Sequence, residues 1–199
     1  MNELPEHFLK ESSMQKETGY SLLELLGVTL VLAVVVAVAV PNLTKANRAY
    51  QLNASAQQIV QLLQSTRQEA ARKNTACKLV FQTNNNTLTD SNGRPIALPV
   101  GVRFESLPSQ ISAPAPVQSA ALNSYLANQH NNAKSSISLP NASGGPGREI
   151  EFSPRGLPVV EPGVLHWIYL VNQDGQRVAV TITSSGSTSI LTYRNGVWS

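Results

Sequence analysis

Cysteine, histidine and charge are all scarce in this chain of 199 residues. The single cysteine, Cys77, excludes an internal disulfide, and we expect it to be a small buried strand residue. The three histidines, His7, His130 and His166, lie far apart and lack the spacing of a metal site. Charged residues make up 14% of the chain, and the formal net charge is +3. Such mild basicity permits contact with anionic surfaces or nucleic acid but does not argue for either.

Catalytic motifs are missing as well. The sequence holds no G-x-S-x-G motif, and no glycine-rich phosphate loop precedes a predicted helix. Glu149 and Glu151 are two residues apart on a predicted strand and therefore share a face. A solvated strand face explains them as well as paired acid and base chemistry would. The sequence therefore predicts no enzyme, no cofactor and no metal.

A long apolar run is the most prominent feature that is present. Residues 25–44 form a run of twenty residues without a charge. At a helical rise of ~1.5 Å per residue, this run is ~30 Å long, which is the thickness of the hydrocarbon core of a bilayer. The run predicts a membrane-spanning helix.

Glu24 stands directly before this run. A carboxylate inside an apolar span costs ~2.5–3.5 kcal/mol and is normally kept where it has a partner. Cleavage after Gly19 would make Tyr20 a new N-terminus, with a positive α-amine four residues from Glu24, about one helical turn away. The alternative is that Glu24 marks the interfacial start of the helix, where an acid favours the helix dipole.

Residues 19–24, read as G-Y-S-L-L-E, together with the apolar run resemble the class III signal of type IV pilins and of the pseudopilins of type II secretion. In that family a prepilin peptidase cuts after the glycine and methylates the new N-terminal residue, and the glutamate pairs with the N-terminal amine of a neighbouring subunit during assembly. The resemblance implies that Gly19 is the cleavage site, Tyr20 the methylated residue and Glu24 the assembly carboxylate. The first mature residue is most often Phe in the family, so Tyr20 is a departure. Pro41 falls where family members often kink their first helix.

An ordinary secretory signal is the alternative to this processing. Residues 37–39, Ala-Val-Ala, form a passable A-x-A cleavage site and would make Val40 the first mature residue. Against it, the segment before the run is net negative, and Glu24 would fall inside the hydrophobic segment. The lysines and arginine that flank the run are balanced, so charge does not set the orientation. The resemblance implies a single-pass inner-membrane protein with its C-terminal domain in the periplasm.

The chain is expected to divide into four segments. Residues 1–19 form a cleaved prepilin leader, residues 20–44 the transmembrane half of a helix, residues 45–74 its amphipathic half, and residues 75–199 a periplasmic β-rich domain with an insertion at 107–147. Asn74 is the expected left-handed C-cap of the helix. The amphipathic half is predicted by an apolar stripe at spacings of three and four: Leu52, Ala56, Ile59, Leu63, Thr66 and Ala70.

Short β runs separated by turn residues follow the helix. Strands are expected at 76–82, near 87–89, and in two runs within 95–106 broken by Pro99 and Gly101. A short helix is expected around residues 120–129 of the insertion. The C-terminal part predicts a meander with tight turns and one solvated face, with strands at 148–152, 164–171, 176–183, 187–194 and 197–198.

A long helix that leads into such a sheet resembles the pilin fold, which is α+β. The order of elements, with F-S-P-R-G-L-P at 152–158 and a terminal N-G-V-W, is most similar to the GspH/FimT group of minor pseudopilins. The resemblance implies a structural subunit of a type II secretion pseudopilus or a type IV pilus, placed near the tip and involved in assembly initiation. Its partners would be other pseudopilins or pilins, through the N-terminal helix, together with prepilin peptidase and the inner membrane.

Two other functions stay open. Some FimT-type relatives bind DNA for uptake through a C-terminal motif with G-R-x-R, but this chain ends L-T-Y-R-N-G-V-W-S and lacks it. The missing motif argues against DNA as a partner, and Arg177 and Arg194 are left as the candidates for a shared basic patch. The other alternative is an anchored or secreted β domain of unrelated role.

Overall fold

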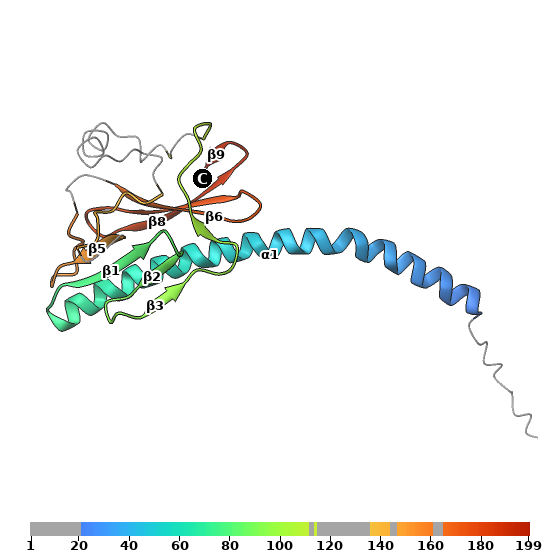
Figure 1. Ribbon diagram of the computed structural model, residues 1–199, viewed down its shortest axis with the longest axis horizontal. Helices are drawn as coiled ribbons and strands as arrows, with labels where there is room; N and C mark the ends of the chain where they lie inside the picture. Colours follow the sequence, from blue (N-terminus) through green and yellow to red (C-terminus); the bar gives the residue numbers. More distant parts are fainter. Residues whose placement is uncertain (1–20, 112–113, 115–135, 144–146, 161–164) are drawn as a thin grey trace, which may run out of the picture. The chain divides into compact units, whose positions relative to one another are not determined.

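The computed structural model describes residues 21–111, 114, 136–143, 147–160 and 165–199. The chain divides into two compact units, Met1–Asn42 and Leu43–Ser199. One long helix is followed by antiparallel strands, which is the α+β arrangement predicted from the sequence and agrees with a pilin fold (Figure 1).

Helix α1 spans Leu22–Lys73, close to the predicted range of 20–73. At its C-terminal end, Asn74 has a φ of 52°, and the Thr75 amide donates to the carbonyl of Ala70 at 3.2 Å. A left-handed residue followed by this hydrogen bond is a Schellman cap. The predicted role of Asn74 is therefore confirmed.

One face of α1 is buried within the unit Leu43–Ser199. Two of its buried residues, Ser55 and Thr66, are polar, and their hydroxyls donate to the carbonyls of Gln51 and Leu62 one turn earlier. Burial therefore leaves neither hydroxyl unsatisfied. The six residues of the predicted stripe are all buried: Leu52, Ala56, Ile59, Leu63, Thr66 and Ala70.

The first sheet has four antiparallel strands in the order β3-β2-β1-β5. Within β1, Cys77, Leu79 and Phe81 are buried and alternate with half-buried residues. One face of this strand thus lies on the core, and the burial predicted for Cys77 is confirmed. The strands are β1 (Cys77–Gln82), β2 (Thr87–Thr89), β3 (Pro95–Ala97) and β5 (Arg148–Phe152).

The second sheet has five antiparallel strands in the order β4-β6-β7-β8-β9. Gly175, with a φ of 76°, lies in the turn between β6 and β7, and Asn195 and Gly196, with φ of 50° and 85°, form the turn between β8 and β9. Two successive positive φ angles are typical of a type I′ hairpin, so the predicted turns are confirmed. The strands are β4 (Arg103–Phe104), β6 (His166–Val171), β7 (Arg177–Ile182), β8 (Thr188–Arg194) and β9 (Val197–Trp198).

Strand β5 is the first correction to the expected meander. It does not join the strands that follow it but pairs with β1 in the first sheet, with Leu79 opposite Ile150. The four strands from β6 to β9 do form a meander in chain order. The error arose because turn residues predict where strands end but not which distant strand edge they meet.

The expected solvated face is the second correction. Every residue of β6 is buried, and all of β7 is buried except the half-buried Arg177. A second apolar cluster lies beyond the main core and contains Leu107, Trp167, Tyr169 and Ala179. Strand β6 reads as a nearly continuous apolar run, which is the pattern of a strand covered on both faces.

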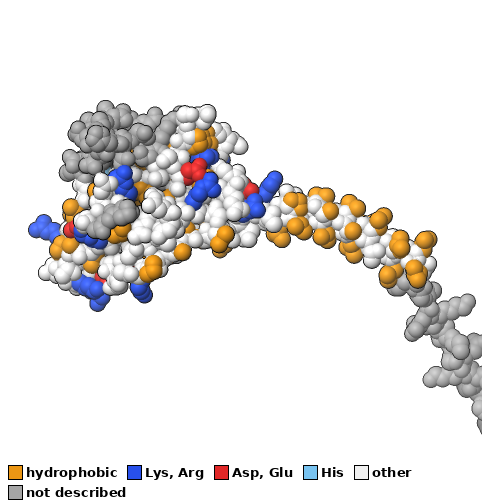
Figure 2. Space-filling model, in the orientation of Figure 1, with side chains coloured by type: hydrophobic (Ala, Val, Ile, Leu, Met, Phe, Trp, Pro, Cys, Tyr) orange, Lys and Arg blue, Asp and Glu red, His pale blue; other side chains and the backbone are white. Residues whose placement is uncertain are grey.

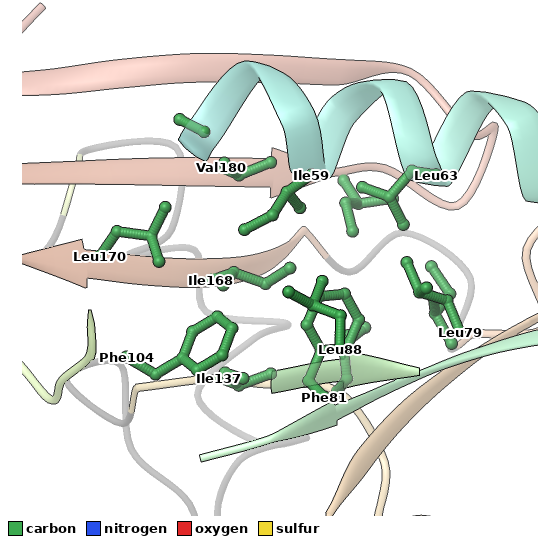
Figure 3. Close-up of a cluster of buried hydrophobic side chains, with 14 of the residues drawn as sticks. Ile59, Leu63, Leu79, Phe81, Leu88, Phe104, Ile137, Ile168, Leu170 and Val180 are labelled. Carbon is green, nitrogen blue, oxygen red and sulfur yellow. The ribbon is translucent and has the colours of Figure 1, made fainter. Parts of the chain in front are cut away.

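The main core lies between α1 and the two sheets. Figure 3 shows Ile59 and Leu63 of α1 among side chains from both sheets, including Val180 of β7 and Leu79 of β1. Phe81 of β1 and Phe104 of β4 meet edge to face, with ring centroids 6.1 Å apart. Offset and edge-to-face aromatic pairs add stability beyond the area that they bury.

Parts of the segment predicted as an insertion, residues 107–147, belong to the two apolar clusters. Ile137 and Leu139 are buried in the main core, and Ile137 bridges to Ile168 of β6, whereas Leu107 is buried in the second cluster. The short helix expected around residues 120–129 lies outside the described residues, as do His7 and His130.

Candidate assembly interface

The residues predicted to carry function lie at the start of α1. Gly19 and Tyr20 are outside the described residues, whereas Glu24 lies in the first helical turn. The carbonyl of Ser21 accepts the amides of Glu24 at 2.9 Å and Leu25 at 3.1 Å, which closes that turn. A carboxylate in the first turn interacts favourably with the helix dipole.

The helix that follows Glu24 exposes its apolar side chains on every side. The large hydrophobic residues between 22 and 42 range in exposure from 53% for Val40 to 82% for Leu22. Figure 2 shows hydrophobic side chains along the visible face of the N-terminal part of the helix. The helix is long and apolar enough to cross a membrane. An exposed apolar surface of this extent marks a membrane or protein contact.

Gly27 and Pro41 are the glycine and the proline of this segment. A Cβ added at Gly27 would meet no atom within 4 Å, so neither the fold nor a neighbouring element of this chain requires a glycine there. Pro41 lies inside α1 and lacks the amide that a helix needs at that position. The kink at Pro41 implied by the resemblance stays a prediction.

Comparison with known families matches residues 55–186 to the model described as type II transport protein GspH. The chain belongs to the GspH family. The curated proteins and the solved structures that were compared contain no match. The matched residues begin well after Glu24, so the family assignment and the N-terminal resemblance rest on different parts of the chain. Both lead to a pseudopilin.

Membership of the GspH family places the chain among structural pseudopilins. No group of three or more His, Cys, Asp or Glu residues capable of holding a metal occurs among the described residues. The sequence offered two candidate chemical sites, Glu149 with Glu151 and His166. The side chains of both make contacts with other residues of the fold.

Glu149 and Glu151 share a single cation from the neighbouring strand. Lys78 of β1 lies 3.0 Å from Glu149 and 3.1 Å from Glu151, measured between the ammonium nitrogen and the nearest carboxylate oxygen. The hydrogen bonds to both glutamates raise the pKa of Lys78. For Glu149, partial burial opposes ionisation, but the bonds from Lys78 and Ser143 outweigh it and lower the pKa. The pair is a cross-strand ion cluster rather than an acid and base pair.

His166 lies on β6 and is fully buried, as expected for a strand residue. Its Nδ1 lies 3.3 Å from the hydroxyl of Ser138, which also accepts the amide of Trp167 at 2.8 Å. Burial lowers the pKa of His166 to about 4, against a smaller raising effect of a backbone hydrogen bond to Ser138. The imidazole is therefore neutral at physiological pH.

The basic patch proposed for Arg177 and Arg194 does not form. Arg177 is paired with Tyr193 across β7 and β8, so Arg194, the next residue, points to the opposite face of the sheet. The guanidinium of Arg177 donates to the carbonyl of Gly175 at 2.7 Å and lies 3.8 Å from Glu105. The described residues therefore offer no support for DNA binding at these two arginines.

Sequence reasoning missed one ion pair that holds α1 against the β domain. Arg48 lies 2.8 Å from Asp174 in the turn between β6 and β7. The side chain of Asn172 accepts the amides of Asp174 and Gln176, each at 3.0 Å, and so orders this turn. The Asp-Gly turn was predicted, but nothing in the local sequence connects it with a residue 126 positions earlier.

Proposed function

We propose that this GspH-family chain is a minor pseudopilin that is built into the pseudopilus of a type II secretion system, near its tip, and takes part in assembly initiation. The observation that supports this most directly is the exposed apolar surface of residues 25–42, which follows a carboxylate, Glu24, in the first turn of the helix. Such a surface needs partners from outside the chain. Neighbouring helices in a filament and the bilayer before assembly both supply them.

Processing precedes assembly in this proposal. Prepilin peptidase cuts after Gly19 and methylates the amine of Tyr20, which stays positively charged. The mature chain then spans the inner membrane once, with Leu43–Ser199 in the periplasm. Residues 1–19 carry two lysines against four glutamates, so their removal leaves a mature chain near +5.

Glu24 sets the register between subunits in the assembled filament. Its carboxylate pairs with the Tyr20 amine of a neighbouring subunit among apolar helices. Leaving one of these charges unpaired in such a medium is costly, on the order of 2.5–3.5 kcal/mol for a carboxylate in an apolar span. A subunit placed one turn out of register would meet this cost, and the pairing therefore selects the correct position.

The first experiment determines the N-terminus of the mature protein by mass spectrometry. A chain that begins at methylated Tyr20 supports the proposal. A chain that retains residues 1–19 contradicts it, and a start at Val40 would mean processing by the ordinary signal peptidase instead.

The second experiment measures incorporation into sheared filaments. Glu24→Gln keeps the size of the side chain and removes its charge, so we expect normal cleavage but strongly reduced incorporation. Glu24→Asp keeps the charge and serves as the matched control, with incorporation closer to that of the unmodified chain. Equal incorporation of the Gln variant and the unmodified chain would exclude this role for Glu24.

A further inference from the structure

A groove of about 720 Å³ opens on the β domain between α1 and two turns. The helix contributes Gln64, Arg67, Gln68 and Ala71, which recur at helical spacing and share one face. The turn after β5 contributes Arg155 and Gly156, and the segment that enters β8 contributes Gly186, Ser187 and Thr188. The groove thus includes part of the F-S-P-R-G-L-P motif, for which the proposed function has no role.

The side chain of Arg67 lies in this groove against two glycines, Gly156 and Gly186. Gly156 has a φ of +72°, and a Cβ there would lie 3.3 Å from Cγ of Arg67. Gly186 has a φ of +84°, and a Cβ there would lie 3.2 Å from Nη1 of Arg67. Both turns therefore need glycine, for their backbone conformation and for the space that Arg67 occupies. The stem of Arg67 thus lies against the turn of Gly156, and its head group lies against the turn of Gly186.

The charge of the groove is positive and has no acid to balance it among the described residues. Its described lining includes two arginines and no Asp or Glu. Within the described part of the chain, no carboxylate forms a salt bridge with Arg67 or Arg155. The contact from Arg67 to the carbonyl of Gly186, at 3.5 Å, is long for a hydrogen bond and leaves donor capacity. Two guanidinium groups in one concave site attract an anion.

We infer that this groove binds an acidic segment of a partner protein, with aspartate or glutamate side chains held by Arg67 and Arg155. Guanidinium groups bind carboxylates through two parallel hydrogen bonds, and the amides and hydroxyls of Gln64, Gln68 and Ser187 can contact the backbone of the same segment. Nucleic acid fits less well, because a polyphosphate backbone needs a row of cations and the described lining holds two. The partner contact at this groove goes beyond the helix-mediated assembly proposed above.

The test uses the full chain in detergent micelles and a short fluorescein-labelled peptide in which glutamate alternates with glycine. We expect the peptide to bind, as a rise in fluorescence anisotropy that weakens between low salt and about 0.15 M salt. The same peptide with glutamine in place of glutamate should not bind. Absence of binding by the glutamate peptide, or equal binding of both peptides, would overturn the inference.

Arg155→Gln is the first variant, because Arg155 is exposed and its replacement does not disturb packing. We expect affinity for the glutamate peptide to fall about tenfold or more. Ser187→Asp, which places a carboxylate in the groove, should weaken binding as well. Arg94→Gln is the matched control, since Arg94 is an exposed arginine that pairs with Asp90 and does not line the groove. Unchanged affinity in both groove variants would overturn the inference.

Two further arms separate the possible explanations. A labelled oligothymidine of similar length that binds more tightly than the glutamate peptide would overturn the assignment to a protein segment. The Glu24→Gln chain should bind the peptide as the unmodified chain does, because Glu24 does not line the groove. Peptide binding should be lost in Arg155→Gln and retained in Glu24→Gln. A failure of the filament proposal therefore stays distinguishable from a failure of the groove proposal.

Discussion

Residues 22–42 and residues 43–73 belong to the same helix but use their apolar side chains in different ways. In the first segment the large apolar side chains are exposed, whereas in the second a stripe from Leu52 to Ala70 is buried against the β domain. The second segment is thus stabilised by contacts that its own chain supplies. The first segment has exposed apolar side chains, which suit a membrane or protein contact.

The charges near the two segments differ in the same way. Arg48 and Asp174 form an ion pair within the β domain unit. For Glu24, the proposed partner is the amine of another subunit. One part of this continuous helix therefore packs within its own domain, and under the proposed function the other part packs against the membrane and neighbouring subunits.

The largest expected effect comes from the buried half of the helix. Leu63→Ala removes a fully buried side chain from the core, and we expect a loss of about 2–5 kcal/mol in the free energy of unfolding of the β domain. Urea unfolding in micelles, followed by the fluorescence of the buried Trp167, measures it. Leu30→Ala is the control in the exposed half and should leave this free energy unchanged. Equal losses would contradict the division of the helix.

Acidification should destabilise the β domain through His166. Its pKa is about 4 in the folded protein and 6.5 when exposed, so the unfolded state binds more protons between these values. The stability from the neutral imidazole is fully present above pH 6.5 and is lost as the pH falls towards 4, by about 3 kcal/mol in total. We expect His166→Gln to flatten the pH dependence of the unfolding free energy in this window. A slope identical to that of the unmodified chain would show that His166 does not cause it.

Gly156→Ala should lower the unfolding free energy by about 1–2 kcal/mol from the left-handed backbone, with a further loss from crowding against Arg67. Gly93→Ala provides the matched control, because Gly93 has a similar φ of +77° but open space around it. The difference between the two variants measures the packing of the turn on α1. Equal losses would mean that backbone strain alone explains Gly156.

The smallest effect is expected for the ion pair between Arg48 and Asp174. Both side chains are partly exposed, so a double-mutant cycle with Arg48→Met and Asp174→Asn should give a coupling of about 0.2–1 kcal/mol. The coupling should decrease at high salt because solvent ions screen the pair. A coupling that does not change with salt would argue against an electrostatic contact.

Much of the fold was predictable because its signals are local. The stripe from Leu52 to Ala70 follows the helical period, and the residues it comprises are all buried. Asn74 and the turns at Gly175 and Asn195 have the positive φ angles that their residue types favour. The resemblance at residues 19–24 and the family match at 55–186 agree on a pseudopilin. For the candidate site, the sequence placed Glu24 in the first turn of the helix, while its assembly role stays a prediction.

The sequence by itself determined the helix, its buried face, the turns and the strand positions, because each depends on residues a few positions apart. Tertiary structure alone decided that β5 pairs with β1, that β6 and β7 are covered on both faces, and that Arg67 lies between the turns of Gly156 and Gly186. These features join residues far apart in the chain. Local periodicity does not predict which distant strand edges pair, since the pairing depends on the packing of the whole core.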